Sequence, residues 1–213
     1  MTMQTAKAVR FHRTGDASVL ELEDHALVEP GPGEVRIIVE AIGLNRAEIM
    51  FREGQYLETP EFPSKLGYEA SGVIDALGAG VDDFSIGERV SSVPAFSMGQ
   101  YGVYGESAIL PASAVARYDE SLSPIEGTSI WMPYVTAYGL LVEVGGLKRG
   151  QVVLITAASS SVGVAAIQIA KAEGATVIAA TRGVEKKRSI SDVGADYVIA
   201  TDENKLAESV MEL

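Results

Sequence analysis

The stretch from Gln151 to Arg188, QVVLITAASSSVGVAAIQIAKAEGATVIAATRGVEKKR, decides the fold. Val152 to Thr156 is a short apolar run rich in β-branched residues, which is typical of a strand buried on both faces. After a serine-rich turn, Val164 to Ala172 has the apolar spacing of a helix that packs on a sheet, and Thr176 to Ala180 predicts a second strand. A dinucleotide-binding fold requires this order of strand, turn, helix and strand.

The turn between the first strand and the helix is made of small residues, Ala158 to Gly163. Unpaired backbone N–H groups and the positive end of the dipole at a helix amino terminus bind a pyrophosphate, which small residues allow to come close. Of the usual Gly-x-Gly-x-x-Gly pattern only the third glycine is kept, as Gly163, while Ala158 and Ser160 replace the first two. The residues that we expect to bind a dinucleotide here are Ser159, Ser160, Ser161, Val162 and Gly163. The alternative is a serine cluster that only caps the helix.

The end of the second strand indicates which dinucleotide binds. An NAD-binding domain places an Asp or Glu about 20 residues beyond the turn, on the ribose 2′-hydroxyl. Here the strand runs into Thr181-Arg182-Gly183 and Lys186 follows, with no carboxylate at the strand end. A guanidinium clamps a 2′-phosphate, whereas a carboxylate would repel it. We therefore expect NADPH as the cofactor, with Arg182 and Lys186 at its 2′-phosphate; the alternative is a solvated basic start of a helix.

Composition excludes several classes of function. The chain has 213 residues, 47% of them hydrophobic, and a net charge of −12, which repels nucleic acid and anionic membranes. It has no cysteine, so disulfides, thiol nucleophiles and thiolate metal ligands are absent, and a reducing cytosol fits. No run approaches the ~18 apolar residues of a membrane span. We expect a soluble, cytoplasmic protein with neither nucleic acid nor membrane as a partner.

The chain from Lys7 to about Ser121 has a different character, because short apolar runs alternate with glycine and proline. The strands that we expect are Ala6 to Phe11, Val35 to Ala41, Ala70 to Leu77, Arg89 to Val93 and Glu106 to Leu110. A short helix over Ala47 to Arg52 follows Asn45 as its cap. Many short strands with turns between them predict a β domain of sandwich or barrel type.

A helix start marks the change from strands to the nucleotide fold. Ser123-Pro124-Ile125-Glu126 has a capping serine, a proline in the first turn and a glutamate that reaches back. We expect the helix to continue from Trp131 to Val144, with a break near Pro133. The sequence thus predicts a β domain over residues 1–122 and a nucleotide-binding domain over residues 123–213.

Eight motifs in register carry a family resemblance. They are Gly33-Glu34-Val35, Gly43-Leu44-Asn45, Gly67 to Val73, Ile86 to Val90, Tyr101 to Glu106, Thr136-Ala137-Tyr138, the serine loop with Gly163, and Gln168 to Lys171. Over nearly its whole length the chain resembles the medium-chain dehydrogenase/reductases, and within them the zinc-free quinone-oxidoreductase (zeta-crystallin-like) branch. The resemblance implies a GroES-like β domain, an incomplete Rossmann domain (a doubly wound parallel sheet), and NADPH-dependent reduction of quinones, enones or related carbonyls.

The residues themselves argue against a catalytic zinc. Such a site wants about three protein ligands, commonly Cys and His, and cysteine is absent. His12 and His25 lie far from every motif, and we expect them to be surface or loop residues. Where related zinc enzymes carry Gly-His-Glu, this chain has Gly67-Tyr68-Glu69. We therefore expect no metal.

Without a metal, a reduction needs hydrogen-bond donors for the charge that develops on the acceptor oxygen. The resemblance implies that Asn45 and Tyr56 line the cleft near the nicotinamide as catalytic residues, and that Thr136 lies beside the cofactor ring. Each of the three side chains can donate a hydrogen bond. The alternatives are that Asn45 only caps a helix, that Tyr56 is only an aromatic lid and that Thr136 only bonds to its own helix.

Two other classes of function stay open. One is a cofactor-binding protein without turnover. The other is an enoyl-reductase module that acts on a carrier-bound acyl chain, although the acidic balance of the chain argues against a basic docking patch.

The part of the chain after Gly150 has room for about three strands and two helices, which is one half of a six-stranded Rossmann fold. We therefore expect a truncated form with little or no activity of its own. The missing half leaves one edge of the strand Val152 to Thr156 bare, which invites pairing with another chain. We expect a homo-oligomer, or another chain or a rearranged segment over that edge, or else a departure of Asp196 to Leu213 from Rossmann geometry.

Overall fold

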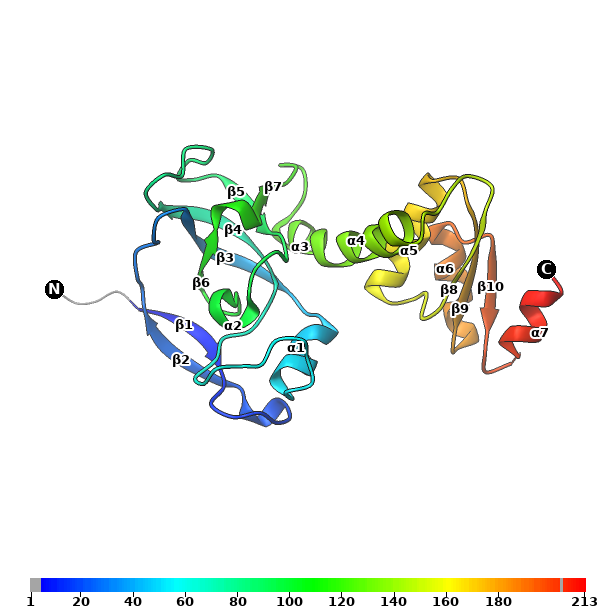
Figure 1. Ribbon diagram of the computed structural model, residues 1–213, viewed down its shortest axis with the longest axis horizontal. Coiled ribbons are helices and arrows are strands. Elements are labelled where there is room, and N and C mark those ends of the chain that lie inside the picture. Colours follow the sequence, from blue (N-terminus) through cyan, green and yellow to red (C-terminus); the bar gives the residue numbers. More distant parts are fainter. Residues whose placement is uncertain (1–4, 204) are drawn as a thin grey trace. The chain divides into compact units, whose positions relative to one another are not determined.

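The computed structural model of the protein describes residues 5–203 and 205–213, and it divides into two compact units after Trp131 (Figure 1). The strands of the first unit are β1 Thr5–Arg10, β2 Glu21–Ala26, β3 Glu34–Gly43, β4 Glu69–Leu77, β5 Arg89–Ser92, β6 Ser107–Pro111 and β7 Val115–Arg117. Its helices are η1 Ala17–Val19, α1 Arg46–Arg52, α2 Met98–Tyr101, η2 Ala112–Ala114 and α3 Pro124–Thr128. The division falls later than residue 122, since α3 packs on β3, β4 and β5.

The first unit is built on antiparallel pairing. Five strands form one sheet in the order β6-β3-β4-β5-β7, and β1 and β2 form a hairpin. Bridges from Ala8 to Gly105 and from Phe11 to Ser64 connect the hairpin strand to the rest of the unit. All five expected strands are present, while β2 and β7 were not expected. The predicted β domain is thus confirmed, with two more strands than its apolar runs indicated.

The core of the first unit explains why these strands stay together. Val35 and Ile37 of β3 are fully buried, together with Ile74 of β4 and Val90 of β5. Phe11 packs edge-on against Phe51 of α1, with ring centroids 5.8 Å apart. Burial of each such side chain contributes roughly 1.5–3 kcal/mol, so the sheet, the hairpin and α1 are stabilised by one apolar core.

Local capping fixes the start of α3 as the sequence predicts. The backbone N–H of Glu126 donates to Ser123 Oγ at 3.3 Å, and Glu126 Oε2 accepts from the Ser123 backbone N–H at 2.8 Å. This reciprocal capping box satisfies two backbone donors that the helix itself leaves free.

The second unit is a three-stranded parallel sheet with helices packed on it (Figure 1). Its elements are α4 Trp131–Tyr138, η3 Gly139–Val144, β8 Val152–Ile155, α5 Ser161–Ala172, β9 Thr176–Thr181, η4 Val184–Lys186, α6 Lys187–Val193, β10 Tyr197–Ala200 and α7 Leu206–Met211. The strand order is β10-β9-β8, and α5 packs on β8 and β9. This is the arrangement expected for one half of a Rossmann fold, so the predicted fold class is confirmed.

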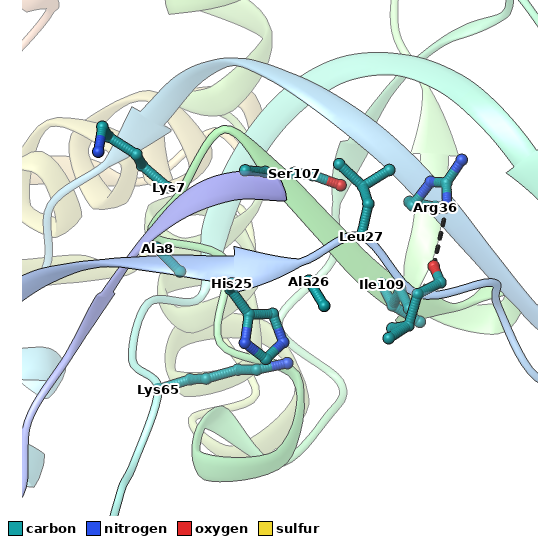
Figure 2. A pocket seen from close by; sticks show the side chains of 11 residues that line it. Lys7, Ala8, His25, Ala26, Leu27, Arg36, Lys65, Ser107 and Ile109 are labelled. Atoms are coloured by element: carbon teal, nitrogen blue, oxygen red, sulfur yellow. Dashed lines mark hydrogen bonds between the residues drawn. The ribbon is translucent and has the colours of Figure 1, made fainter. Parts of the chain in front are cut away.

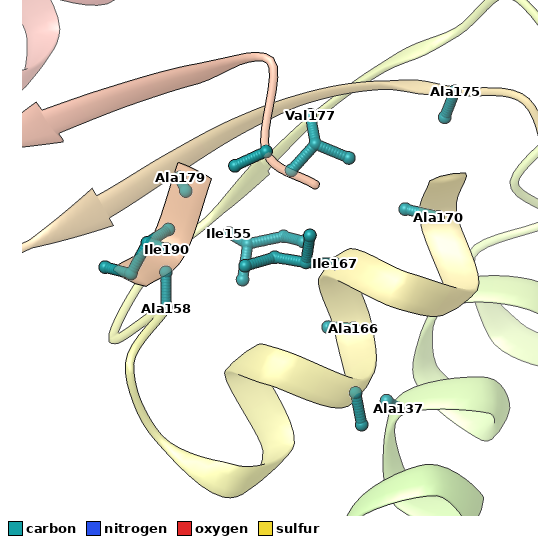
Figure 3. Close-up of a cluster of buried hydrophobic side chains, with 12 residues drawn as sticks. Ala137, Ile155, Ala158, Ala166, Ile167, Ala170, Ala175, Val177, Ala179 and Ile190 are labelled. Atoms are coloured by element: carbon teal, nitrogen blue, oxygen red, sulfur yellow. The ribbon is translucent and has the colours of Figure 1, made fainter. Parts of the chain in front are cut away.

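Small side chains let α5 lie close to the sheet. Figure 3 shows Ala166, Ile167 and Ala170 of α5 turned toward Ile155 of β8 and Val177 of β9. All five are at most 7% exposed. Because alanine adds little bulk, the helix axis approaches the strands, and its amino terminus is held at the carboxyl ends of β8 and β9.

The long helix expected from Trp131 to Val144 differs in two ways. It does not break at Pro133, which lies in the first turn of α4, where a proline removes no intrahelical hydrogen bond. The break comes earlier, between Thr128 and Trp131, and residues Gly139–Val144 continue as a π-helix. The π-helix has no fully buried residue, and its Leu141 packs, partly buried, against the apolar core of the second unit.

The outer edge of β8 is open within the described part of the chain, where β8 pairs only with β9. Val152 is 63% and Leu154 is 42% exposed. The segment Tyr197–Ala200 does not cover this edge, since it pairs in parallel with β9 and keeps Rossmann geometry. A covering chain and a homo-oligomer stay predictions.

None of the helices in the described residues has the length and apolar character needed to cross a bilayer.

A substitution at Gly72 of β4 tests how closely β4 packs against β3. A Cβ atom at Gly72 would lie 2.0 Å from the carbonyl oxygen of Ile38 in β3, and a backbone atom cannot yield as a side chain does. We expect Gly72→Ala to lower the free energy of unfolding by about 3 kcal/mol or more. Trp131 fluorescence in urea reports the transition, because its indole Nε1 donates to Ser91 of the first unit.

Gly80→Ala is the matched control for this substitution. Gly80 has φ +79° but nothing within 4 Å of an added Cβ, so only the backbone conformation is strained, at about 1 kcal/mol. Equal losses for the two variants would contradict the steric explanation.

Candidate functional site

An open hollow of about 500 Å³ lies in the second unit at the carboxyl ends of β8, β9 and β10. It is lined by Thr156, Ala157, Ser159, Ser160, Ala180, Thr181, Arg182, Lys186, Thr201 and Leu206. The structure therefore brings Ser159, Ser160, Arg182 and Lys186 together around one space, as the sequence predicts. Ser161, Val162 and Gly163 form the first turn of α5, directly after the lining residues.

The turn after β8 is held by backbone contacts. Ala157 has φ 49°, in the left-handed region, and the Ala158 N–H donates to the carbonyl oxygen of Ala180 at 3.0 Å. Ser160 is the N-cap of α5, and its Oγ accepts from the Gly163 backbone N–H at 3.1 Å. The helix begins at Ser161, three residues before the predicted start at Val164, because the serine cap satisfies a donor that would otherwise be free.

Gly163 is the residue that lets the helix approach the turn. A Cβ atom at this position would lie 2.6 Å from the carbonyl oxygen of Ala157 and 2.7 Å from Ala158 Cα. Only glycine fits without moving α5 away from the turn. This is the role that the third glycine of a dinucleotide-binding turn has in helix–strand packing.

The basic residues of the hollow come from the end of β9 and from η4. Arg182 and Lys186 are exposed, and neither side chain forms an ion pair or hydrogen bond with the residues that the structure describes. Asp202 is engaged through its backbone N–H, which donates to the Arg182 carbonyl, and its carboxylate accepts weakly from the Val184 N–H at 3.4 Å. The two cationic groups are therefore available to an anion in the hollow.

Thr136 lies elsewhere in the second unit. It is a half-buried residue of α4, next to Ala137, which belongs to the apolar core under α5. Thr136 does not line the hollow.

Asn45 lies in a polar cluster of the first unit. Its Nδ2 donates to Glu69 at 2.8 Å and weakly to Glu48 at 3.5 Å, and its backbone N–H donates to Glu48 at 2.6 Å. Burial raises the pKa of the Glu48 carboxyl, against hydrogen bonds from backbone groups and Asn45 that lower it. The amide hydrogens of Asn45 are thus already directed at two carboxylates.

Tyr56 belongs to the same cluster through Tyr68. Glu48 Oε1 accepts from the Tyr68 backbone N–H at 3.2 Å, and the rings of Tyr68 and Tyr56 meet at 6.3 Å. The pKa of Tyr68 is raised by burial and by a hydrogen bond to Tyr56. The structure therefore links Asn45, Glu48, Tyr68 and Tyr56 in one connected group.

Sequence reasoning gave Glu48 and Glu69 no role. The spacing of Asn45 and Glu48, three residues apart at a helix start, is a capping signal and could have linked these two. Glu69 meets Asn45 only because Glu69 pairs with Gly43 across β3 and β4, and no local pattern shows that register.

One group of metal-type ligands occurs in the described residues, but it lies apart from these clusters. Donor atoms of His12, Glu21 and Glu23 are within 4.8 Å of one another at the surface of the first unit. Glu23 is engaged there by His12 at 2.5 Å and by Arg10 at 3.4 Å. The polar cluster around Asn45 holds two carboxylates, those of Glu48 and Glu69, and neither histidine nor cysteine.

Known proteins share this architecture. The model of the alcohol dehydrogenase GroES-like domain matches residues 31–120. A quinone oxidoreductase from Pseudomonas aeruginosa is 34% identical over 208 residues, which cover 98% of this chain and 62% of that protein. The Escherichia coli quinone oxidoreductase complexed with NADPH superposes with a TM-score of 0.86 at 30% identity, over 97% of this chain and 62% of that one. The chain belongs to the quinone-oxidoreductase branch of the medium-chain dehydrogenase/reductases.

Within these medium-chain dehydrogenase/reductases, cofactor use is not uniform. The crystal structure of an NAD-dependent alcohol dehydrogenase is also similar, with a TM-score of 0.91 and 33% identity over 97% of this chain and 66% of that one. The chain spans 62% of the length of the Pseudomonas aeruginosa relative.

Substitutions of Ser160 and Ser159 distinguish a serine that caps the helix from one that only lines the hollow. Replacing Ser160 with alanine removes the acceptor of the Gly163 N–H, and we expect the free energy of unfolding of the second unit to fall by about 1 kcal/mol without any ligand. Ser159→Ala is the control, since Ser159 lines the hollow but caps nothing. Urea unfolding followed by far-UV circular dichroism measures both, and equal stability of the two variants would argue against the cap.

Proposed function

We propose that the hollow of the second unit binds NADPH. The observation that carries this proposal is the meeting of the amino terminus of α5 with two unpaired cationic side chains, Arg182 and Lys186, around one space. The lack of room for a Cβ at Gly163 supports it, because the turn is shaped for a close approach of helix and strand. The complex of the Escherichia coli relative with NADPH agrees with this choice of cofactor.

The serine turn is suited to the pyrophosphate. Ser160 Oγ accepts the Gly163 N–H, so its own O–H remains to donate to a phosphate oxygen. Ser159 and Ser161 are exposed at the same end of the helix, where the dipole favours negative charge. In this serine-rich turn, hydroxyl donors thus supplement the backbone N–H groups.

Arg182 and Lys186 would hold the 2′-phosphate that distinguishes NADPH from NADH. Arg182 follows the last buried residue of β9, Thr181, and so stands at the strand end where an NAD-binding chain carries an acidic residue. Its guanidinium offers paired donors that match a phosphate, and Lys186 adds a second charge.

The reaction that we propose is reduction of a quinone, enone or related carbonyl without a metal. NADPH, when bound, supplies the hydride for such a reduction. The names of the related quinone oxidoreductases support this substrate class. Of the first unit's polar cluster, Tyr56 is the candidate donor to an acceptor oxygen, since its phenol O–H can donate a hydrogen bond and its ring lies beside that of Tyr68. Asn45 acts as a positioning residue, because Glu48 and Glu69 take its amide hydrogens.

Arg182→Asp tests the choice of dinucleotide. The change puts a carboxylate where the guanidinium would meet the 2′-phosphate, and we expect the preference for NADPH over NADH to reverse by about 1–3 kcal/mol. Isothermal titration of both dinucleotides into this chain gives the ratio of their dissociation constants. Arg188→Asp is the control, because it makes the same charge change on α6 at a residue that does not line the hollow. An unchanged ratio for Arg182→Asp would exclude this role.

Ser160→Glu tests the pyrophosphate position separately. A carboxylate in the turn repels the pyrophosphate, so NADPH and NADH should weaken alike, by about tenfold or more, with their ratio unchanged. If Ser160→Glu binds both dinucleotides as tightly as the unsubstituted chain does, the pyrophosphate does not bind at this turn. Absorbance of NADPH in the presence of 9,10-phenanthrenequinone or a simple enone then separates turnover from binding alone.

A further inference from the structure

A second hollow lies in the first unit, beside the β1–β2 hairpin (Figure 2). His25 of β2, Lys65, Arg36 of β3, and Ser107 and Ile109 of β6 are among the residues that line it. Its volume of about 40 Å³ has room for roughly three water-sized groups, which is the size of a small anion. It is separate from the polar cluster around Asn45, since the two share no residue.

Lys65 is the unusual residue of this hollow. Its side chain is half-buried, yet its ammonium forms no hydrogen bond or ion pair with any residue in the described ranges. Burial and the nearby charge of Arg10 lower the pKa of Lys65, while the charge of Glu34 acts in the opposite direction. Glu34 is itself engaged, because its carboxylate accepts from the Tyr101 hydroxyl and from the Gly31 N–H. The half-buried ammonium is thus left without a counterion at ion-pair distance among the described residues.

His25 adds a second group that can carry positive charge. Figure 2 shows its ring beside the ammonium end of Lys65. Burial lowers the pKa of His25, and the charges of Lys65 and Arg10 lower it further, while Glu23 acts in the opposite direction. Glu23 does not reach the hollow freely, since it is held by His12 at 2.5 Å and by Arg10 at 3.4 Å.

Arg36 and Lys7 are two further cationic residues of the hollow, but the charge of each is balanced within the chain. Lys7 pairs with Asp24 at 3.1 Å. For Arg36, the partners are an acidic side chain and a carbonyl. Its guanidinium donates to Asp75 at 2.9 Å and to the carbonyl oxygen of Val28 at 2.9 Å. Among the described residues, the Lys65 ammonium and the His25 ring are therefore the basic groups of this hollow that form no ion pair, in a chain whose net charge is −12.

We propose that the hollow beside the β1–β2 hairpin is a binding site for a small oxyanion of the carboxylate or phosphate class, held by the Lys65 ammonium and the protonated imidazole of His25. Such an anion supplies the counterion that Lys65 lacks, and it fits the small volume. Binding requires a proton on His25, so it is tighter at lower pH, and the bound anion in turn raises the pKa of His25.

Proton NMR of the two histidines tests this site. Sodium sulfate represents the tetrahedral phosphate class and sodium acetate the carboxylate class, each compared with sodium chloride at equal ionic strength. We expect the ring signals of His25 to shift saturably with sulfate or acetate, and the titration midpoint of His25 to move upward. His12 lies at the surface beside Glu23 and serves as the internal control.

Lys65→Met should weaken the anion response of His25 by about tenfold or more, because a charge-assisted contact is lost. Lys65→Arg should keep most of it. Lys148→Met makes the same charge change at an exposed position in the second unit and should behave as the unsubstituted chain does. Anion binding in the hollow of Arg182 would leave the His25 signals unchanged, so the two sites are distinguished.

A response of Lys65→Met equal to that of the unsubstituted chain would overturn the proposal, as would shifts of His12 and His25 by equal amounts. If Lys65→Met does not fold, the unsubstituted chain decides alone. A saturable upward movement of the His25 midpoint, without one at His12, supports the site, and its absence with both anions refutes it.

Discussion

The contact between the first turn of α5 and the loop after β8 is the constraint on which the second unit depends. Gly163 has no side chain, and so the helix lies against the backbone of Ala157 and Ala158. The Ala158 N–H is fixed to the carbonyl of Ala180, which ties the loop to the end of β9. Because both ends of this contact are backbone, the amino terminus of α5 and the start of the Arg182 segment are held at one edge of the sheet.

Local placement of charge, rather than net charge, decides what the second unit can bind. At the other end of the sheet Lys171 is paired with Asp196 at 2.8 Å, and this hydrogen bond together with one from the Val177 N–H lowers the pKa of Asp196. Because the two charges of this pair neutralise each other, this end of the sheet offers little electrostatic attraction to a charged ligand. Arg182 and Lys186 have no such partner among the described residues, so an acidic chain still presents a cationic edge where α5 begins.

Much of this architecture could be predicted because the relevant signals are local. Apolar β-branched runs gave β8 and β9, and the serine and basic residues that follow them do line one hollow. The hairpin strand β2 was missed because Glu21–Ala26 is rich in acidic residues with low strand propensity, and its pairing with β1 forms it. The partners of Asn45 and the lone ammonium of Lys65 could not be predicted, since they depend on which strands lie side by side.

The polar cluster of the first unit shows why a residue type alone does not define a role. An asparagine was expected to donate to an acceptor, but Glu69 and Glu48 direct its Nδ2 inward, and reversal of the amide would place its oxygen against both carboxylates. That reversal becomes favourable only when a carboxyl carries a proton, and burial raises the pKa of Glu48 in that direction. Glu69 accepts from Nδ2 at the shorter distance, 2.8 Å against 3.5 Å for Glu48, so a proton on Glu48 alone leaves the amide held by Glu69. The orientation of the Asn45 amide therefore depends on both carboxyls, whereas Tyr56 joins the cluster through the ring of Tyr68.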